Sequence, residues 1–343
     1  MRLSRRQTLS GGIATLFGRP ALAEVGKIID HAGRSVPIPP TVARVLPAGP
    51  PASILLYTAT PDLLIGWSRA LRREERAFLL PDVAARPEVG RLTGRGNTAN
   101  LELVLKFKPD LIVDVGSITD TYISLADRVQ EQTGLAYALL DGRIDRSADA
   151  YRLYGRLIRQ EARLSALADQ VDAMLRVIKT RVGVIPEGDR PRVYYARGQR
   201  GLETGLGGSI NVESIEFMGA VNVAGGQRGG LANISMEQIL AWDPEVIVTI
   251  DPDFARNALT DPAWRSLPAV RAGRVHLSPR LPFGWIDFPP SVNRLVGLWW
   301  LGKVLYPSIF PEDLRPIARN FYQQFYHVVM TDDRMKQVME NQA

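Results

Sequence analysis

Two stretches of the chain share one pattern of apolar and polar positions. Residues 100–113 read NLELVLKFKPDLIV and residues 235–248 read SMEQILAWDPEVIV, at a constant offset of 135 positions. In each copy a capping residue opens a short apolar segment with a glutamate two positions on, and a proline ends it. An acid then precedes a run of aliphatic residues. Each copy therefore predicts a short helix, a turn and a strand.

The predicted strands are apolar without interruption, as in residues 111–113 and 246–250. A strand of this kind is covered on both faces, which is typical of a mainly parallel sheet wrapped by helices. Further strand candidates fit the same plan: residues 42–46, 63–67 and 135–140 near the first copy, and residues 192–196, 221–224 and 274–277 near the second. The repeat thus predicts two α/β lobes of mainly parallel sheet.

A helical pattern connects the two halves. Residues 147–184 carry apolar positions at helical spacing and contain no proline; the next proline in the chain is Pro186. Some thirty such residues would form a helix about 45 Å long, a stiff connector that lets the lobes close only by small angles. Two shorter helices broken around residues 161–165 are the alternative. We therefore expect lobes at residues 24–146 and 185–343, with the connecting helix between them and the ligand cleft between the lobes.

The first 23 residues have the features of an export signal. Arg2, Arg5 and Arg6 precede a short apolar stretch, and the small residues Ala21 and Ala23 frame a cleavage site. The segment SRRQTL at residues 4–9 resembles the twin-arginine export signature. We expect cleavage near Ala23 and a mature chain in the periplasm.

Composition narrows the functional classes. Apolar residues make up 45% and charged residues 23% of the chain, as in folded proteins, and the absence of cysteine excludes disulfides, thiolate metal sites, cysteine nucleophiles and a cysteine-linked lipid anchor. Only three histidines are present, widely scattered. Beyond residue 23 there are 38 basic and 36 acidic side chains, which is not the profile of a nucleic-acid-binding protein. We expect no metal ligands and no cofactor of the protein's own.

Candidate ligand contacts follow the predicted strands, because post-strand loops of two facing lobes would line the cleft. Arginines offer a charged fork of donors for carboxylates and oxyanions, serines and glycine-rich loops offer further donors, and an aromatic wall could stack on a flat ligand. On this basis the predicted contacts are Arg95, Ser117, Tyr195, Arg197, Ser209 and Trp285.

The motifs of common enzyme classes are missing from the sequence. There is no His-Glu-x-x-His zinc helix, no Gly-x-Ser-x-Gly elbow and no Walker loop. Asp114 and Asp141 stand at strand ends, where acids often cap the next turn. We therefore assign no catalytic residues and expect a protein that is not an enzyme.

Taken together, the short motifs resemble those of the periplasmic binding proteins of iron-siderophore and cobalamin ABC importers. The resemblance covers about residues 25–330 and rests on the segments DHAGR at 30–34, NLE at 100–102, KPDLI at 108–112, EQI at 237–239, DP at 243–244, FGW at 283–285 and PPS at 289–291. It implies two lobes, a long connecting helix and a monomeric protein. It also implies that Glu102 and Glu237 dock on arginine pockets of an inner-membrane permease, which works with a cytoplasmic ATPase.

The resemblance leaves the ligand open. A ferric siderophore or another metal chelate of the iron, haem or cobalamin class is the first hypothesis, and a molybdate or tungstate oxyanion is the second. An exported enzyme that has kept the binding-protein fold is a third alternative. A cleft too small for an organic chelator would favour the oxyanion.

Overall fold

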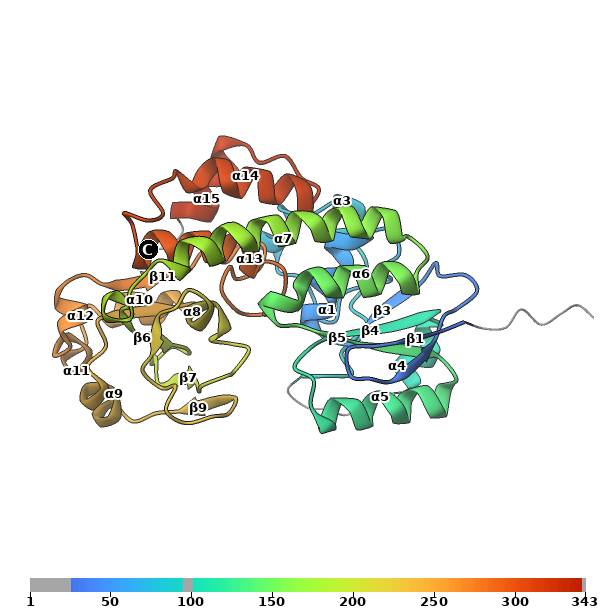
Figure 1. Cartoon of the computed structure of the whole chain (residues 1–343), viewed down its shortest axis with the longest axis horizontal. Coiled ribbons are helices and arrows are strands. Elements are labelled where there is room, and N and C mark those ends of the chain that lie inside the picture. The colour runs from blue at the N-terminus through green and yellow to red at the C-terminus, as the bar shows by residue number, and fades with distance from the viewer. Residues whose placement is uncertain (1–25, 95–100, 341–343) are drawn as a thin grey trace, which may run out of the picture.

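The computed structural model describes residues 26–94 and 101–340. They form two α/β lobes, as predicted, with a long helix running across both (Figure 1). None of the helices in these two ranges combines the length and the apolar character needed to cross a lipid bilayer. The expected signal at residues 1–23 lies outside the described residues, as does Arg95.

The first lobe is built on a parallel sheet with strand order β3-β4-β5. A small antiparallel hairpin, β1 and β2, lies beside it. The strands are β1 (Lys27–Ile29), β2 (Ser35–Pro37), β3 (Val45–Pro47), β4 (Leu111–Gly116) and β5 (Ala136–Asp141); the helices are α1 (Pro50–Ala59), α2 (Arg73–Arg76), α3 (Pro81–Ala84), α4 (Leu101–Phe107) and α5 (Asp120–Thr133). β4 is buried along nearly its whole length, as expected for a central parallel strand.

The second lobe has a parallel sheet with strand order β11-β10-β6-β8 and a separate antiparallel pair, β7 and β9. Its strands are β6 (Arg192–Ala196), β7 (Glu203–Gly205), β8 (Val221–Asn222), β9 (Leu231–Asn233), β10 (Val246–Thr249) and β11 (Val275–Leu277). Its helices are α8 (Glu213–Phe217), α9 (Met236–Trp242), α10 (Pro252–Asn257), α11 (Pro262–Arg265), α12 (Pro268–Arg271) and α13 (Arg294–Leu305), followed by α14 (Leu314–Phe325) and α15 (Asp332–Glu340).

The structure confirms the internal repeat as two helix-turn-strand units. α4 and α9 begin at Leu101 and Met236, and β4 and β10 begin at Leu111 and Val246, each pair separated by the same 135 positions. Among the other predicted strands, β6 has the predicted bounds and β5 is shifted by one residue, whereas those predicted over 42–46 and 274–277 are reduced to the three-residue strands β3 and β11. Residues 63–67 contribute only isolated bridges, and the strand predicted over 221–224 is reduced to β8.

The helix predicted over residues 147–184 is interrupted, which corrects that expectation. The chain forms α6 (Ser147–Leu157) and then α7 (Glu161–Gly183), with Arg159 between them in a left-handed conformation at φ 59°. The two helices pack closely, since a Cβ atom on Gly155 would lie 2.8 Å from the Cβ of Leu164. The break at residues 158–160 adjoins residues 161–165, around which the alternative expected it. α7 alone is the long connector, about 35 Å in length, and the small closure angle expected from it stays a prediction.

The C-terminal helices return to the first lobe. α13 packs against both α7 and α14, and α14 and α15 lie above α7 in the view of Figure 1. The hydroxyl of Tyr57, on α1, donates a hydrogen bond of 2.6 Å to the carbonyl of Tyr326, just after α14. One continuous hydrophobic cluster contains residues of both lobes and of these helices. The lobes are thus joined by a packed core as well as by α7.

Candidate functional site: a cavity between the lobes

A cavity of about 480 Å³ lies between the two lobes, beyond the carboxyl ends of the sheet strands. Both lobes contribute to its wall. The first lobe supplies Pro50, Pro51, Thr93, Gly94, Asp114, Val115, Gly116, Ser117, Ile118, Tyr122, Leu139 and Leu140; the rest of the chain supplies Glu203, Ile210, Asn211, Leu231 and Pro290. The cavity is therefore where the sequence placed the ligand cleft.

On the first lobe, the end of β4 brings a buried carboxyl group to the cavity. Asp114 is 5% exposed and accepts hydrogen bonds from the hydroxyl of Thr93 (3.1 Å) and from that of Tyr137 (3.4 Å). Burial raises its pKa to about 6, against the lowering effect of these hydrogen bonds. Ser117 follows β4 and is exposed on the same wall. The first lobe thus offers a hydroxyl and a carboxyl group that can change charge near neutral pH.

On the second lobe, two layers of polar side chains support the wall. The amide of Asn211 lines the cavity and donates to Asp287 over 2.9 Å. Asp287 is fully buried and also accepts from the hydroxyl of Tyr195 over 2.8 Å. Arg197 lies between two carboxylates: its Nε is 3.4 Å from Asp287, and its Nη1 is 3.1 Å from Glu203, which lines the cavity.

Burial has the largest effect on the pKa of the carboxyl group in this second layer. Burial raises the pKa of Asp287 although the Arg197 guanidinium acts in the opposite direction. Arg197 is 6% exposed, so its charge lies one layer behind the cavity surface. Tyr195, Arg197 and Asp287 therefore hold Asn211 and Glu203 in place and do not themselves form the wall.

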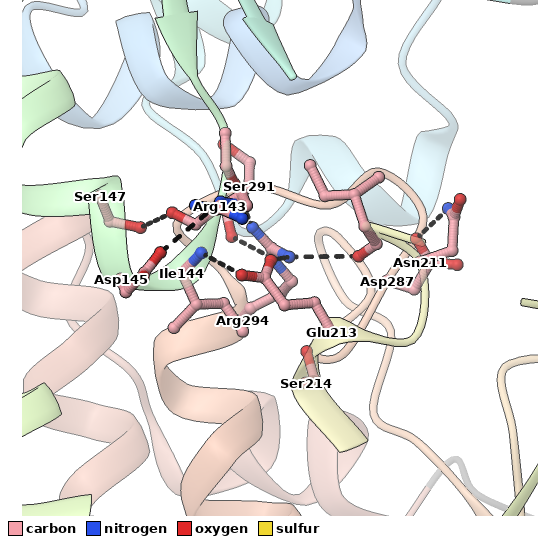
Figure 2. Close-up of polar contacts among 12 residues, drawn as sticks. Arg143, Ile144, Asp145, Ser147, Asn211, Glu213, Ser214, Asp287, Ser291 and Arg294 are labelled. Carbon is pink, nitrogen blue, oxygen red and sulfur yellow. Dashed lines mark hydrogen bonds and ion pairs between the residues drawn. The ribbon is translucent and has the colours of Figure 1, made fainter. Parts of the chain in front are cut away.

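A set of polar contacts joins the two lobes (Figure 2). The guanidinium of Arg294, 1% exposed, pairs with the carboxylate of Glu213 at 2.7 Å and also donates to the carbonyl of Gly142. The other Glu213 oxygen accepts from the backbone N–H of Ile144 over 2.9 Å. Ser291 donates to the carbonyl of Pro51 over 2.9 Å. We refer to Arg294, Glu213 and their backbone partners at Gly142 and Ile144 as the inter-lobe bracket.

The structure separates the predicted ligand contacts. Ser117 is on the cavity wall. Tyr195, Arg197 and Ser209 are buried next to wall residues, and the Ser209 hydroxyl is 3.3 Å from the Asn211 side chain. Trp285 is 1% exposed in the core, with its indole N–H 3.2 Å from the Tyr322 hydroxyl. Its ring therefore does not form the aromatic wall expected from the sequence.

The sequence pattern did not predict the polar wall residues Thr93, Asp114, Asn211 and Glu203 as contacts. Thr93 precedes Gly94, and Asn211 follows Gly207 and Gly208, so both belong to glycine-containing loops; Asp114 stands at a strand end, where an acid was expected to cap the next turn. Glu203, in β7, carried no recognisable signal. In the described ranges, no three histidine, aspartate or glutamate side chains come together in a way that could hold a metal ion.

The two glutamates of the repeat are both exposed, on α4 and α9. Ser235 caps α9 by accepting from the N–H of Gln238 over 3.2 Å. The pKa of Glu237 is lowered by its own backbone N–H and by the Ser235 hydroxyl, so this carboxylate is charged at neutral pH.

A comparison with protein families identifies the fold and its role. The model of the family described as periplasmic binding protein matches residues 60–280. The chain belongs to this family. This membership confirms the resemblance seen in the sequence and the two-lobed α/β fold. It also shows that the chain is a solute-binding component of an ABC importer.

Individual relatives agree with this membership. The molybdate-binding protein MolA of Haemophilus influenzae is 27% identical over 270 residues, which cover 72% of this chain and 76% of the relative. A solved ABC transporter solute binding protein from Sulfurospirillum deleyianum superposes with a TM-score of 0.83 at 28% identity, covering 92% of this chain and all of the other. The molybdate-bound structure of MolA has a TM-score of 0.73 at 22% identity, covering 89% and 99% of the two chains.

Proposed function

We propose that this periplasmic binding protein captures a preassembled metal chelate, of the ferric siderophore, haem or cobalamin class, and delivers it to an inner-membrane permease. The observation that carries the proposal is the inter-lobe cavity of about 480 Å³. Sites that bind small organic molecules enclose roughly 300–1,000 Å³ and combine a mainly apolar wall with a few polar groups. Here Val115, Ile118 and Leu139 provide apolar surface, and Ser117 and Asn211 provide hydrogen-bonding groups.

A molybdate or tungstate oxyanion is the second candidate. It is favoured by the similarity to the molybdate-binding protein of Haemophilus influenzae. An oxyanion needs converging donors, and the hydroxyl of Ser117 and the amide of Asn211 face the cavity from the two lobes. Arg197, one layer behind the wall, would offset the negative charge of the wall residue Glu203.

Titration calorimetry with chelates and with oxyanions distinguishes the two candidates directly. The probes are ferrioxamine B, haemin, cyanocobalamin, sodium molybdate and sodium tungstate. We expect one chelate to bind with one site per chain. Binding of molybdate or tungstate alone would establish the second candidate, and no binding of any of the five would contradict the assignment of this cavity.

A charge placed on the exposed part of the wall sharpens the test. Ser117→Asp should weaken an oxyanion at least about tenfold through like-charge repulsion, while Ser117→Asn, of nearly the same size, should not. Cyanocobalamin, which carries no net charge, should respond alike to both variants. The site proposed here binds and does not catalyse, so any chelate should be recovered unchanged after incubation.

Delivery requires export and a permease. We propose that residues 1–23 direct twin-arginine export and that cleavage near Ala23 releases a monomeric periplasmic chain. We also propose that Glu102 and Glu237 pair with basic residues of the permease. This is supported by their equivalent repeat positions and by their exposure, one on each lobe. Of the remaining sequence predictions, we propose Ser117 as a direct contact, with Tyr195, Arg197 and Ser209 supporting the wall; Arg95 stays a prediction.

A further inference from the structure

Exposed leucines occur at matching positions of the two repeat helices. Leu105 on α4 is 60% exposed and Leu240 on α9 is 40% exposed. They are related by the same 135-position offset as the helices themselves. Each lies three residues after the repeat glutamate, Glu102 or Glu237, which on a helix places the two side chains on one face.

Packing within each lobe does not account for these leucines. The preceding repeat positions, Val104 and Ile239, are fully buried and already anchor each helix to its lobe. A single exposed leucine on a protein surface needs no explanation. Here, however, two exposed leucines occupy equivalent positions of a repeat, and each lies beside an exposed acid. The same pairing of leucine and acid therefore occurs once on each lobe.

The placement of the helices makes this surface accessible to one partner. α4 and α9 lie in different lobes and both lie on the side of the molecule away from α7 (Figure 1). A partner that contacts both must present the same complementary surface twice, as a two-fold symmetric assembly does.

We infer that Leu105 and Leu240 are apolar anchors for the two equivalent subunits of the membrane permease, each inserting beside the ion pair made by the neighbouring glutamate. The inference rests on the proposed function and adds a hydrophobic contact to the charge pairing. The partner surface is apolar with an adjacent basic residue, such as arginine, whose aliphatic stem can cover the leucine. A second copy of this chain is disfavoured as the occupant, because it would bring acid against acid and α9 carries no basic residue to offset this.

Site-specific photo-crosslinking in cells that express the chain with its own importer tests the inference. A photoreactive phenylalanine derivative replaces Leu105, Leu240 or, as the control, Val177, which is 41% exposed on α7. We expect positions 105 and 240 to crosslink to a membrane subunit that mass spectrometry identifies as an ABC permease, and position 177 not to do so. Crosslinks from one lobe only, none to the permease, or crosslinks to a second copy of this chain would overturn the inference.

Purified components separate this inference from the proposed function. The double variant Leu105→Asp with Leu240→Asp should lower the affinity for the permease in nanodiscs at least about tenfold, while Val177→Asp leaves it unchanged. If Glu102→Ala with Glu237→Ala weakens the complex and the leucine variants do not, the permease partner stands and the apolar anchors are wrong. If neither pair affects binding, docking through the repeat helices fails as well.

Discussion

At the scale of single residues, Asp114 is the most informative group of the cavity. It is almost fully buried, its hydrogen-bond partners are hydroxyls, and burial raises its pKa to about 6 from 3.8. The folded chain therefore holds this proton more tightly than the unfolded chain. The associated stability is fully present below pH 3.8 and is lost as the pH rises toward and through about 6.

Replacing Asp114 by Asn should remove this pH dependence, since the amide is neutral at every pH and can still accept from Thr93. The free energy of unfolding of Asp114→Asn, relative to the unmodified chain, should rise by about 2 kcal/mol between about pH 4.5 and about pH 7.5. Urea unfolding at the two pH values measures it. Asp120→Asn, at an exposed position on α5, is the control and should show no such rise. An Asp114→Asn difference that does not change with pH would contradict the raised pKa.

At the scale of elements, the inter-lobe bracket fixes how α8 and α13 meet the loop after β5. Arg294 begins α13 and Glu213 begins α8, and together they bind the backbone at Gly142 and Ile144 of the first lobe (Figure 2). Removing one partner of a buried ion pair leaves an uncompensated charge, whereas removing both can be far less costly. The bracket should therefore behave as one unit.

A double-mutant cycle measures this coupling. Arg294→Met should cost about 3–5 kcal/mol of unfolding free energy, and combining it with Glu213→Gln should cost less than the sum of the single variants by about 1–3 kcal/mol. The exposed pair Arg256 and Asp253 serves as the control, because surface ion pairs contribute about 0–1 kcal/mol. A coupling in the bracket no larger than in that surface pair would show that the lobes are not joined in this way.

At the scale of the whole molecule, the sequence predicted what local chemistry determines. The cap, proline and apolar run of the repeat predict α4, β4, α9 and β10 because these signals lie close together in the chain, at residues 100–113 and 235–248. It could not determine contacts made across the fold. The partners of Arg294 are 81 and 152 positions away, and Trp285 is turned inward by Tyr322, 37 positions away. The pattern of aromatics and glycines around Trp285 is the same whether the ring faces the core or the cleft.

The central proposal is that a metal-containing solute is held between the two lobes, at the end of β4. Native mass spectrometry with metal analysis of protein isolated from the periplasm tests it most directly, using the unmodified chain and Ser117→Trp. Ser117 is exposed on the wall, so the indole should fill the cavity without disturbing either core. We predict one metal-containing solute per unmodified chain and none on the variant. A solute that remains bound to Ser117→Trp at full occupancy, or one without metal, would contradict the account.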